Sequence, residues 1–218
     1  MAAANTSIRA VPGQPGTYVN EATGEAFKLV EFRDDDKYDT EAAASSISTG
    51  TKLTFFQNLT NKNTIDKNFS DSHKLSANET MVISRVGVDI PLARGNNLVR
   101  PEDVKKISYN GVLEIKLNSV VIAEGPLYKW PSGYGLSGMT NENNQGVVSI
   151  GVPSTAARRP LAKEHYITDK HQINATVTFE DRAWDTNSTS LSGAAIVLNA
   201  PVHIKVYLGG LIGTAATK

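Results

Sequence analysis

Four stretches of the chain alternate apolar and polar residues with a period of two, which is typical of antiparallel strands that bury one face. Residues 111–119 show it most cleanly, because every second position carries a large aliphatic side chain and most positions between are polar. The predicted inward positions of the four stretches are Val82, Ser84, Val86, Val88 and Ile90; Leu113, Ile115 and Leu117; Ile173, Ala175, Val177 and Phe179; and Val202, Ile204, Val206 and Leu208. The alternation therefore predicts four strands that each have one apolar face.

Shorter apolar runs between turn residues predict further strands, over residues 26–32, 52–57, 120–124, 146–151 and 194–198. Pro101 to Lys106 predicts the start of a short helix, because proline comes first, acids follow and bases come last, as suits the helix dipole. Residues 34–48 are interpreted as a solvated acidic loop followed by one or two helical turns. Residues 154–160 are interpreted as a loop.

Eight to ten strands and one or two short helices predict an all-β protein. Strands do not alternate with long helices, and no sequence repeat has a fixed period, which excludes parallel α/β folds, solenoids and propellers. We expect an antiparallel β-sandwich of the jelly-roll type. A single jelly roll is favoured over a double one, because sixteen strands would leave roughly 13 residues for each strand and its connection, too few for the long loops.

The distribution of Pro, Gly and small residues divides the chain into three predicted parts. Residues 1–48 form an N-terminal arm and lead-in segment, residues 49–212 form the sandwich domain, and residues 213–218 form a flexible tail. The N-terminus lacks the basic start and apolar stretch of a secretory signal, and the longest apolar runs are too short to span a bilayer. We therefore expect no membrane span.

Composition narrows the function classes. The chain has 218 residues and no cysteine, which excludes disulfides, thiolate catalysis and cysteine-ligated metals. Lys and Arg number 22 and Asp and Glu also number 22, so the net charge is zero. A cationic nucleic-acid binder or a protein of membrane surfaces would normally carry an excess of positive charge.

Catalytic and metal-binding motifs do not stand out. The histidines (His73, His165, His171 and His203) lack a ligand spacing, and Asp34 to Asp36 lack the pattern of a calcium loop. The Gly-x-Gly-x-x-Gly string from Gly133 to Gly138 is not followed by a helical pattern, so it predicts a flexible loop rather than a nucleotide site. We expect no enzyme activity, no cofactor and no metal site.

Two small groups of residues are candidates for contacts. Tyr128, Trp130, Tyr134 and Trp184 lie in predicted loops, where they would form a sugar-stacking patch, or else plug one end of the sandwich or pack at an interface. Arg158 and Arg159 would contact the phosphates of a genome, or else form ordinary solvated charge.

The order of several segments resembles a known family. A strand introduced by Gly50 to Gln57 (GTKLTFFQ) is followed by a long polar loop, the strand Met81 to Ile90, a helical turn at 101–107 and the strand at 111–118. Pro126 to Gly135 (PLYKWPSGYG) comes next, and the chain ends with the strand from Val202 to Leu208 and Gly209-Gly210. Over residues 50–210 this order resembles the jelly-roll major capsid proteins of small tailless, icosahedral viruses of bacteria.

The resemblance implies a virion structural protein, most of all a major capsid protein that is assembled in the host cytoplasm into an icosahedral shell. Its partners would be copies of itself, with other virion proteins as further candidates, and the family implies neither catalysis nor a cofactor. An alternative is a carbohydrate- or receptor-binding β-sandwich, such as a spike or tail-associated protein, which the loop aromatics favour. A β-sandwich hydrolase with carboxylates that meet only in space is a third class, although no residues single themselves out for it.

Overall fold

The computed structural model describes residues 7–21, 24, 26–58, 60–90, 101–132, 136–137, 149–150, 158–180 and 195–215. In chain order the elements are β1 (Ser7–Ala10), β2 (Thr17–Asn20), β3 (Ala26–Ala43), β4 (Ser46–Ile47), β5 (Lys52–Phe55), β6 (Glu79–Asp89), α1 (Pro101–Asn110), β7 (Gly111–Leu117), β8 (Val120–Pro126), the 3-10 helix η1 (Leu127–Lys129), β9 (Leu136–Ser137), β10 (Ser149–Ile150), β11 (Arg159–Thr168), β12 (Ile173–Phe179), β13 (Ile196–Val197) and β14 (Val202–Ala215). The paired strands are antiparallel, which confirms the predicted all-β fold.

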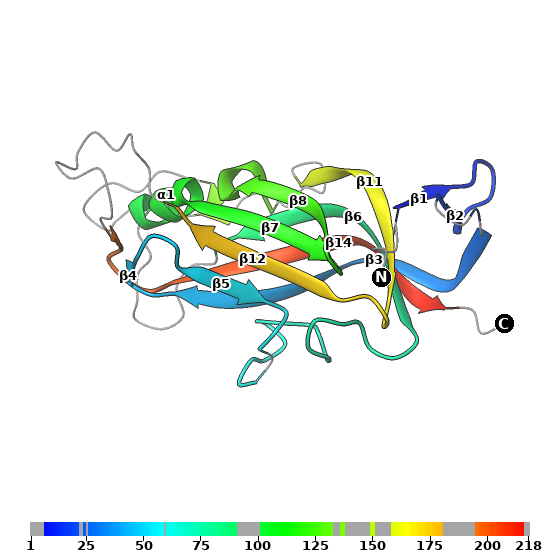
Figure 1. Ribbon diagram of the computed structural model, residues 1–218, viewed down its shortest axis with the longest axis horizontal. Coiled ribbons are helices and arrows are strands. Elements are labelled where there is room, and N and C mark those ends of the chain that lie inside the picture. Colours follow the sequence, from blue (N-terminus) through cyan, green and yellow to red (C-terminus); the bar gives the residue numbers. More distant parts are fainter. Residues whose placement is uncertain are drawn as a thin grey trace.

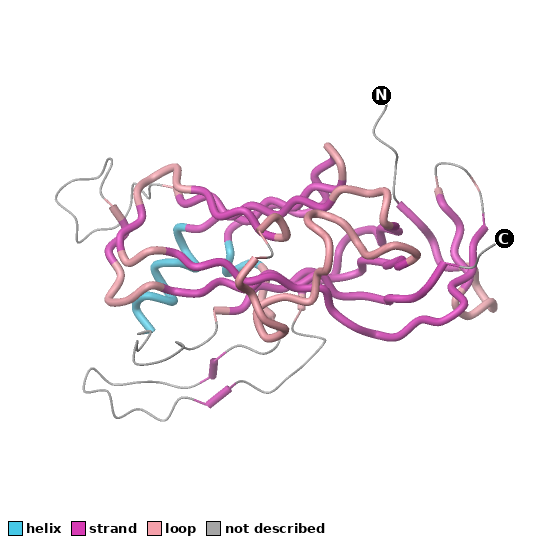
Figure 2. The backbone as a smooth tube through the Cα atoms, turned by 90° about the horizontal axis from the view of Figure 1, so that it is seen from below, coloured by secondary structure: helices cyan, strands magenta, loops and turns pink. Residues whose placement is uncertain are grey.

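Two sheets face each other across one main hydrophobic core (Figure 1). One has the order β5-β12-β7-β8. The other has the order β1-β11-β6-β14-β3-β2 and closes on itself, because β2 also pairs with β1. Two further two-stranded pairs, β13-β4 and β9-β10, lie outside these sheets. The molecule is therefore a β-sandwich, with α1 beside it (Figure 2).

The four-stranded sheet follows the predicted period of two. β12 and β7 pair along their whole length in a single register, with Val177 opposite Leu113 and Ala175 opposite Ile115. Each of these four side chains is fully buried, while the intervening positions are partly exposed. The predicted inward faces of residues 111–119 and 171–180 are thus confirmed.

A bulge in β6 changes which side chains face the main core. Gly209 of β14 lies opposite Arg85 and Gly210 lies opposite Ile83, so Ser84 has no partner in that register. An extra residue in one strand reverses the alternation beyond it. As a result Ile83 faces the main core, whereas Val82 packs in a second, smaller core. The prediction of one continuous face from Val82 to Ile90 is wrong before the bulge and correct after it.

The expected division at residue 48 does not separate an arm from the sheet. Residues 26–43 form the 18-residue strand β3, which pairs with β14 from Leu29 to Ala43. The loop and helical turns expected within 34–48 are wrong, because Asp34 and Asp36 lie within this strand and are paired with Arg85 and Arg158. Cations on neighbouring elements allow an acidic run to form a strand.

The C-terminal strand and β11 also extend beyond the expected loops. β14 continues through Gly209 to Ala215, so residues 213–215 of the expected tail belong to a strand. β11 begins at Arg159, inside the loop expected over 154–160. The sequence of β11 does not alternate apolar and polar residues, and Ile167 is the one buried residue of this strand.

One end of the large sheet projects beyond the sandwich. The hairpin of β1 and β2 lies there, at the right of Figure 1, where β2 pairs with the start of β3 and β1 pairs with β11. The second core, made of Ile8, Tyr18 and Val82, lies under this hairpin with Leu211 against it. The segment expected to be a loose arm therefore forms paired strands from Ser7 to Asn20.

Candidate functional site

Tyr128 belongs to an exposed aromatic pair. It lies in η1, and its ring is 5.0 Å from that of Tyr109 in α1, measured between centroids, with 33° between the ring planes. Tyr128 is 58% exposed and Tyr109 is 42% exposed. Leu127 points into the core and fixes this segment. Two tilted rings at the surface offer an apolar contact patch with two hydroxyl groups, which suits a sugar or a partner protein.

Trp130 is not part of that patch. Its side chain is 3% exposed and belongs to the main core, and its indole N–H donates to the carbonyl oxygen of Gly125 at 3.3 Å. The Trp130 carbonyl oxygen accepts a hydrogen bond of 2.7 Å from the N–H of Val88 in β6. Burial excludes Trp130 from a sugar-stacking surface patch and agrees with the alternative that this segment plugs the sandwich: the residue anchors the segment after η1 to the large sheet. Tyr134 and Trp184 lie outside the described residues.

Arg158 is also unavailable for a nucleic acid. It is 4% exposed, its Nε donates to the Ser132 carbonyl oxygen at 2.7 Å, and its guanidinium pairs with the carboxylate of Asp36. The predicted genome contact through Arg158 is wrong for that reason. Arg159 is exposed, and its guanidinium lies 5.5 Å from the centre of the Trp130 ring.

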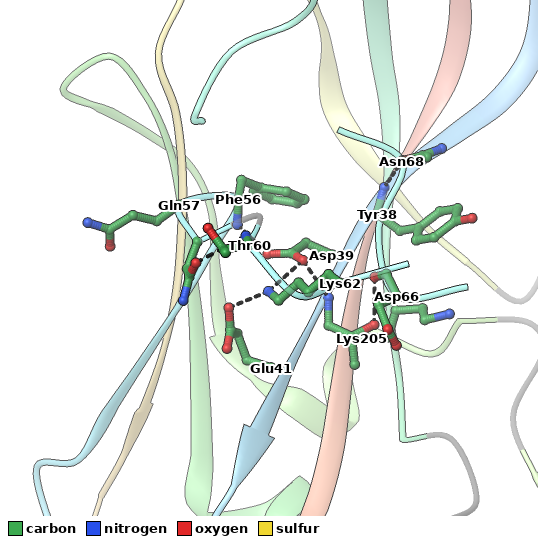
Figure 3. Close-up of polar contacts among 12 residues, drawn as sticks. Tyr38, Asp39, Glu41, Phe56, Gln57, Thr60, Lys62, Asp66, Asn68 and Lys205 are labelled. Atoms are coloured by element: carbon green, nitrogen blue, oxygen red, sulfur yellow. Dashed lines mark hydrogen bonds and ion pairs between the residues drawn. The ribbon is translucent and has the colours of Figure 1, made fainter. Parts of the chain in front are cut away.

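The most concentrated polar cluster lies between β3 and the segment 56–75, and sequence reasoning missed it (Figure 3). Asp39, Glu41 and Lys62 form its centre: Lys62 Nζ lies 2.8 Å from Asp39 Oδ1 and 2.5 Å from Glu41 Oε1. Asp39 and Glu41 lie opposite Val206 and Ile204 of β14, so both carboxylates are on the side of β3 that faces the core. Asp39 and Glu41 are two positions apart, a spacing that puts both side chains on one face of a strand. Because the sequence predicts a loop and helical turns over residues 34–48, it does not place them together.

Hydrogen bonds to the main chain hold the Asp39 carboxylate in place. Its Oδ2 accepts from the N–H of Phe56 at 2.7 Å and its Oδ1 accepts from the N–H of Thr40 at 2.9 Å. Burial raises the pKa of Glu41 above its ordinary value, and the charge of Asp39 adds to the rise while Lys62 opposes it. The cluster thus combines a fully buried carboxylate, a second carboxyl group with a raised pKa and a lysine between them.

Asn68 fastens the same segment to the edge of β3. Its Oδ1 accepts from the N–H of Tyr38 at 2.7 Å and its Nδ2 donates to the Asp36 carbonyl oxygen at 2.5 Å. Its own N–H donates to the Tyr38 carbonyl oxygen at 3.2 Å. The side chain and main chain of Asn68 therefore satisfy the edge of β3 at Asp36 and Tyr38, beyond the residues that pair with β2, and this stretch of the edge is not open to pairing with another chain.

The histidines do not gather. His73 Nδ1 lies 2.9 Å from the Ile173 carbonyl oxygen, and His171 Nδ1 accepts from the N–H of Thr168 at 3.1 Å. Burial lowers the pKa of both His165 and His171. Among the residues that the structure describes, no three His, Asp or Glu side chains are grouped in a way that could hold a metal ion.

No family model matches the chain, and no curated protein matches its sequence. Within the described part of the chain, no helix is both long and apolar enough to cross a membrane.

Proposed function

We propose that the chain is a virion structural protein, most of all a major capsid protein, that assembles with copies of itself into an icosahedral shell. The observation that carries the proposal is the strand order. When the eight principal strands (β3, β5, β6, β7, β8, β11, β12 and β14) are numbered 1 to 8 along the chain, one sheet has the order 1-8-3-6 and the other 2-7-4-5. Only the connection from 4 to 5 stays within one sheet.

This order is that of two nested Greek keys, which supports a single jelly roll. Jelly rolls with eight strands recur in viral capsid proteins and in lectins. The eight principal strands run from β3 to β14 and make up both facing sheets, so a second set of eight strands is not needed to account for the chain. The single fold also agrees with the resemblance in the order of segments from residue 50 to residue 210.

The projecting end of the large sheet supports self-association. The β1–β2 hairpin carries strands past the sandwich, where they are free to meet a neighbouring subunit (Figures 1 and 2). Phe32, which lies in the projecting part of β3, is 43% exposed. In a shell, burial of such side chains between subunits would favour assembly, and a net charge of zero avoids repulsion between many copies.

A carbohydrate-binding module is the second candidate, and the exposed pair of Tyr109 and Tyr128 favours it. Aromatic faces stack on the apolar faces of sugar rings, and lectins also use jelly rolls. Under this alternative the protein acts as a spike or receptor-binding subunit rather than as the shell.

Sedimentation velocity of the purified full chain, at rising protein concentration, tests the first proposal. A shell protein is expected to form large species of uniform size that electron microscopy resolves as closed particles. A chain that remains monomeric at every concentration contradicts the proposal. In parallel, a glycan array with the wild type and the Tyr109→Ala/Tyr128→Ala double variant tests the alternative, which requires retention that the variant loses.

A further inference from the structure

The cluster of Asp39, Glu41 and Lys62 has the components of a self-forming cross-link. Lys62 Nζ touches one oxygen of each carboxylate, at 2.8 Å for Asp39 and 2.5 Å for Glu41 (Figure 3). The Asp39 side chain is fully buried and that of Lys62 is 13% exposed. Lysine and a carboxylate that are held together out of water are ordinarily an ion pair, but the same contact places an amine beside a carboxyl carbon.

Removal of water favours the neutral forms that amide formation requires. Desolvation disfavours both ammonium and carboxylate groups in general, and a neutral amine is the form that attacks a carboxyl carbon. Burial raises the pKa of Glu41, so this residue accepts a proton more readily than a carboxyl group in water. An acid that both accepts and returns a proton close to the reacting atoms is a general acid–base catalyst.

The main chain supplies a second requirement, stabilisation of the oxygen that gains charge. The N–H groups of Phe56 and Thr40 donate to the two oxygens of the Asp39 carboxyl group at 2.7 and 2.9 Å. Donors that are already oriented stabilise the tetrahedral intermediate of acyl transfer. Fixed geometry also replaces a bimolecular encounter, for which effective molarities of about 10⁵ M and higher are known.

We propose that Lys62 and Asp39 become joined by an intramolecular amide bond, with Glu41 as the proton carrier. One ammonium proton of Lys62 passes through Glu41 to an oxygen of Asp39, which leaves a neutral Nζ and an ionised Glu41. Nζ attacks Cγ of Asp39, and Glu41 accepts a second proton from the nitrogen as the N–C bond forms. Glu41 gives this proton to the Asp39 hydroxyl group, the C–O bond breaks and one water molecule leaves. The ammonium and carboxylate become an amide and water, so the step needs no oxidant, reductant or other reactant.

The bond would fasten the segment that follows β5 to the middle of β3. Residues 39 and 62 are 23 positions apart, and the cross-link would close the chain between them. This inference does not rest on the proposed capsid function, since it concerns the chemistry of one chain alone. A shell protein would nevertheless gain from a covalent bond that secures a long surface loop.

A second buried ion pair, between Lys37 and Glu79, has the lysine and one carboxylate but no second carboxylate among its described contacts, so it serves as an internal comparison. Lys37 Nζ lies 2.6 Å from Glu79 Oε1, and these side chains are 9% and 20% exposed. Among the described contacts of Lys37 Nζ, the other polar partner is the Asn68 carbonyl oxygen at 3.3 Å rather than a second carboxylate. This pair is as close as the Asp39–Lys62 pair but has no second acid to carry the proton, so we expect it to remain an ion pair.

Intact mass measurement of the denatured full chain tests the proposal, because an amide survives denaturation and an ion pair does not. We expect a mass lower than that of the sequence by one water molecule. After trypsin treatment, the peptide Tyr38–Lys52 is expected to be joined to Leu53–Lys67, with Lys62 uncleaved. A mass equal to that of the sequence overturns the proposal, as does loss of water that maps to a cyclised aspartate within a single peptide.

Three variants separate the components. Lys62→Arg keeps a cation between the carboxylates but cannot form this amide, so its mass should equal that of its sequence. Glu41→Gln keeps the shape of the side chain and removes the proton carrier, and we expect at least a tenfold slower loss of water after synthesis. Lys37→Arg, the control, should lose water as the wild type does. A cross-link that forms in Glu41→Gln at the wild-type rate overturns the role of Glu41, and circular dichroism checks that each variant is folded.

Discussion

Two regions of strand pairing, one in each of the facing sheets, differ in how they are held. β7 and β12 pair without interruption, bury aliphatic and aromatic side chains on one face and leave polar side chains on the other. β14 lies between β3 and β6, where a bulge interrupts the register, and the inner side of β3 carries Lys37, Asp39 and Glu41. The first region depends on the burial of apolar area, and the second depends in addition on ion pairs and on close approach of the backbones.

Gly210 offers the sharpest test of the second region. A Cβ atom at this position would lie 1.8 Å from the carbonyl oxygen of Val82, which is backbone and cannot rotate away. We expect Gly210→Ala to lower the free energy of unfolding by about 4 kcal/mol or more, in the range of severe core defects. Urea unfolding followed by circular dichroism measures it.

Gly13→Ala is the matched control for Gly210. Gly13 has a φ of 76° but no atom within 4 Å of the added Cβ, so backbone strain alone should cost about 1 kcal/mol. Equal losses for the two variants would show that β14 and β6 move apart easily, against the tight approach at the bulge.

Phe179 tests the regular region. It is fully buried at the end of β12 in the main core, and Phe179→Ala should cost about 3–5 kcal/mol through lost burial and the cavity that remains. Thr178→Ala, on the opposite face of the same strand, should change stability by no more than about 0.5 kcal/mol. A similar loss for both variants would contradict the one-sided burial of this sheet.

Asn68 tests the edge of β3. Asn68→Ala removes two hydrogen bonds to the main chain of that strand, and leaves a part-buried N–H and carbonyl group without them, so we expect a loss of about 2 kcal/mol. Hydrogen exchange at the amide of Tyr38 should become faster. Asn58→Ala removes an exposed hydrogen bond that the Thr60 N–H donates to Asn58 Oδ1. It should leave both the unfolding free energy and the exchange rate of the Tyr38 amide unchanged.

The smallest effect concerns the pH dependence of stability that arises from two histidines, His165 in β11 and His171 in the turn before β12. Burial lowers the pKa of His165 and His171, so the folded state favours their neutral forms and the unfolded state binds more protons near pH 6.5. Their contribution to stability is complete above about pH 7.5 and is lost as the pH falls through the folded pKa. On acidification from that pH towards 6, the urea midpoint of the wild type should therefore decrease relative to that of a His165→Gln/His171→Gln variant, and a relative increase would contradict the burial of these rings.

The pairing of β7 with β12 could be predicted from the sequence because each of these two strands has one buried face and one partly exposed face. The period of two in residues 111–119 and 171–180 then reports directly on burial. β3 could not be recognised beyond residue 32, because its acidic residues find cations on β6 and before β11, from residues distant in the sequence. β11 lacks alternation, and the bulge at Ser84 reversed a face that the sequence pattern made continuous.

The candidate sites show the same limit. Tyr128 was selected correctly as a surface residue, but its partner Tyr109 comes from a helix that only the fold brings beside it. Trp130 and Arg158 are residue types that often contact sugars or phosphates. In the fold both are buried, and hydrogen bonds join them to the carbonyl oxygens of Gly125 and Ser132. Asp39, Glu41 and Lys62 meet only when the loop after β5 folds back over β3, which local patterns do not encode.

Cryo-electron microscopy of the material that sediments from a preparation of the full-length protein tests the central claim most directly. The account predicts closed particles of icosahedral symmetry whose repeating unit accommodates the two facing sheets, with the hairpin formed by residues 7–20 at a contact between units. Single, unassociated subunits, or particles whose density has no room for this sandwich, would contradict it.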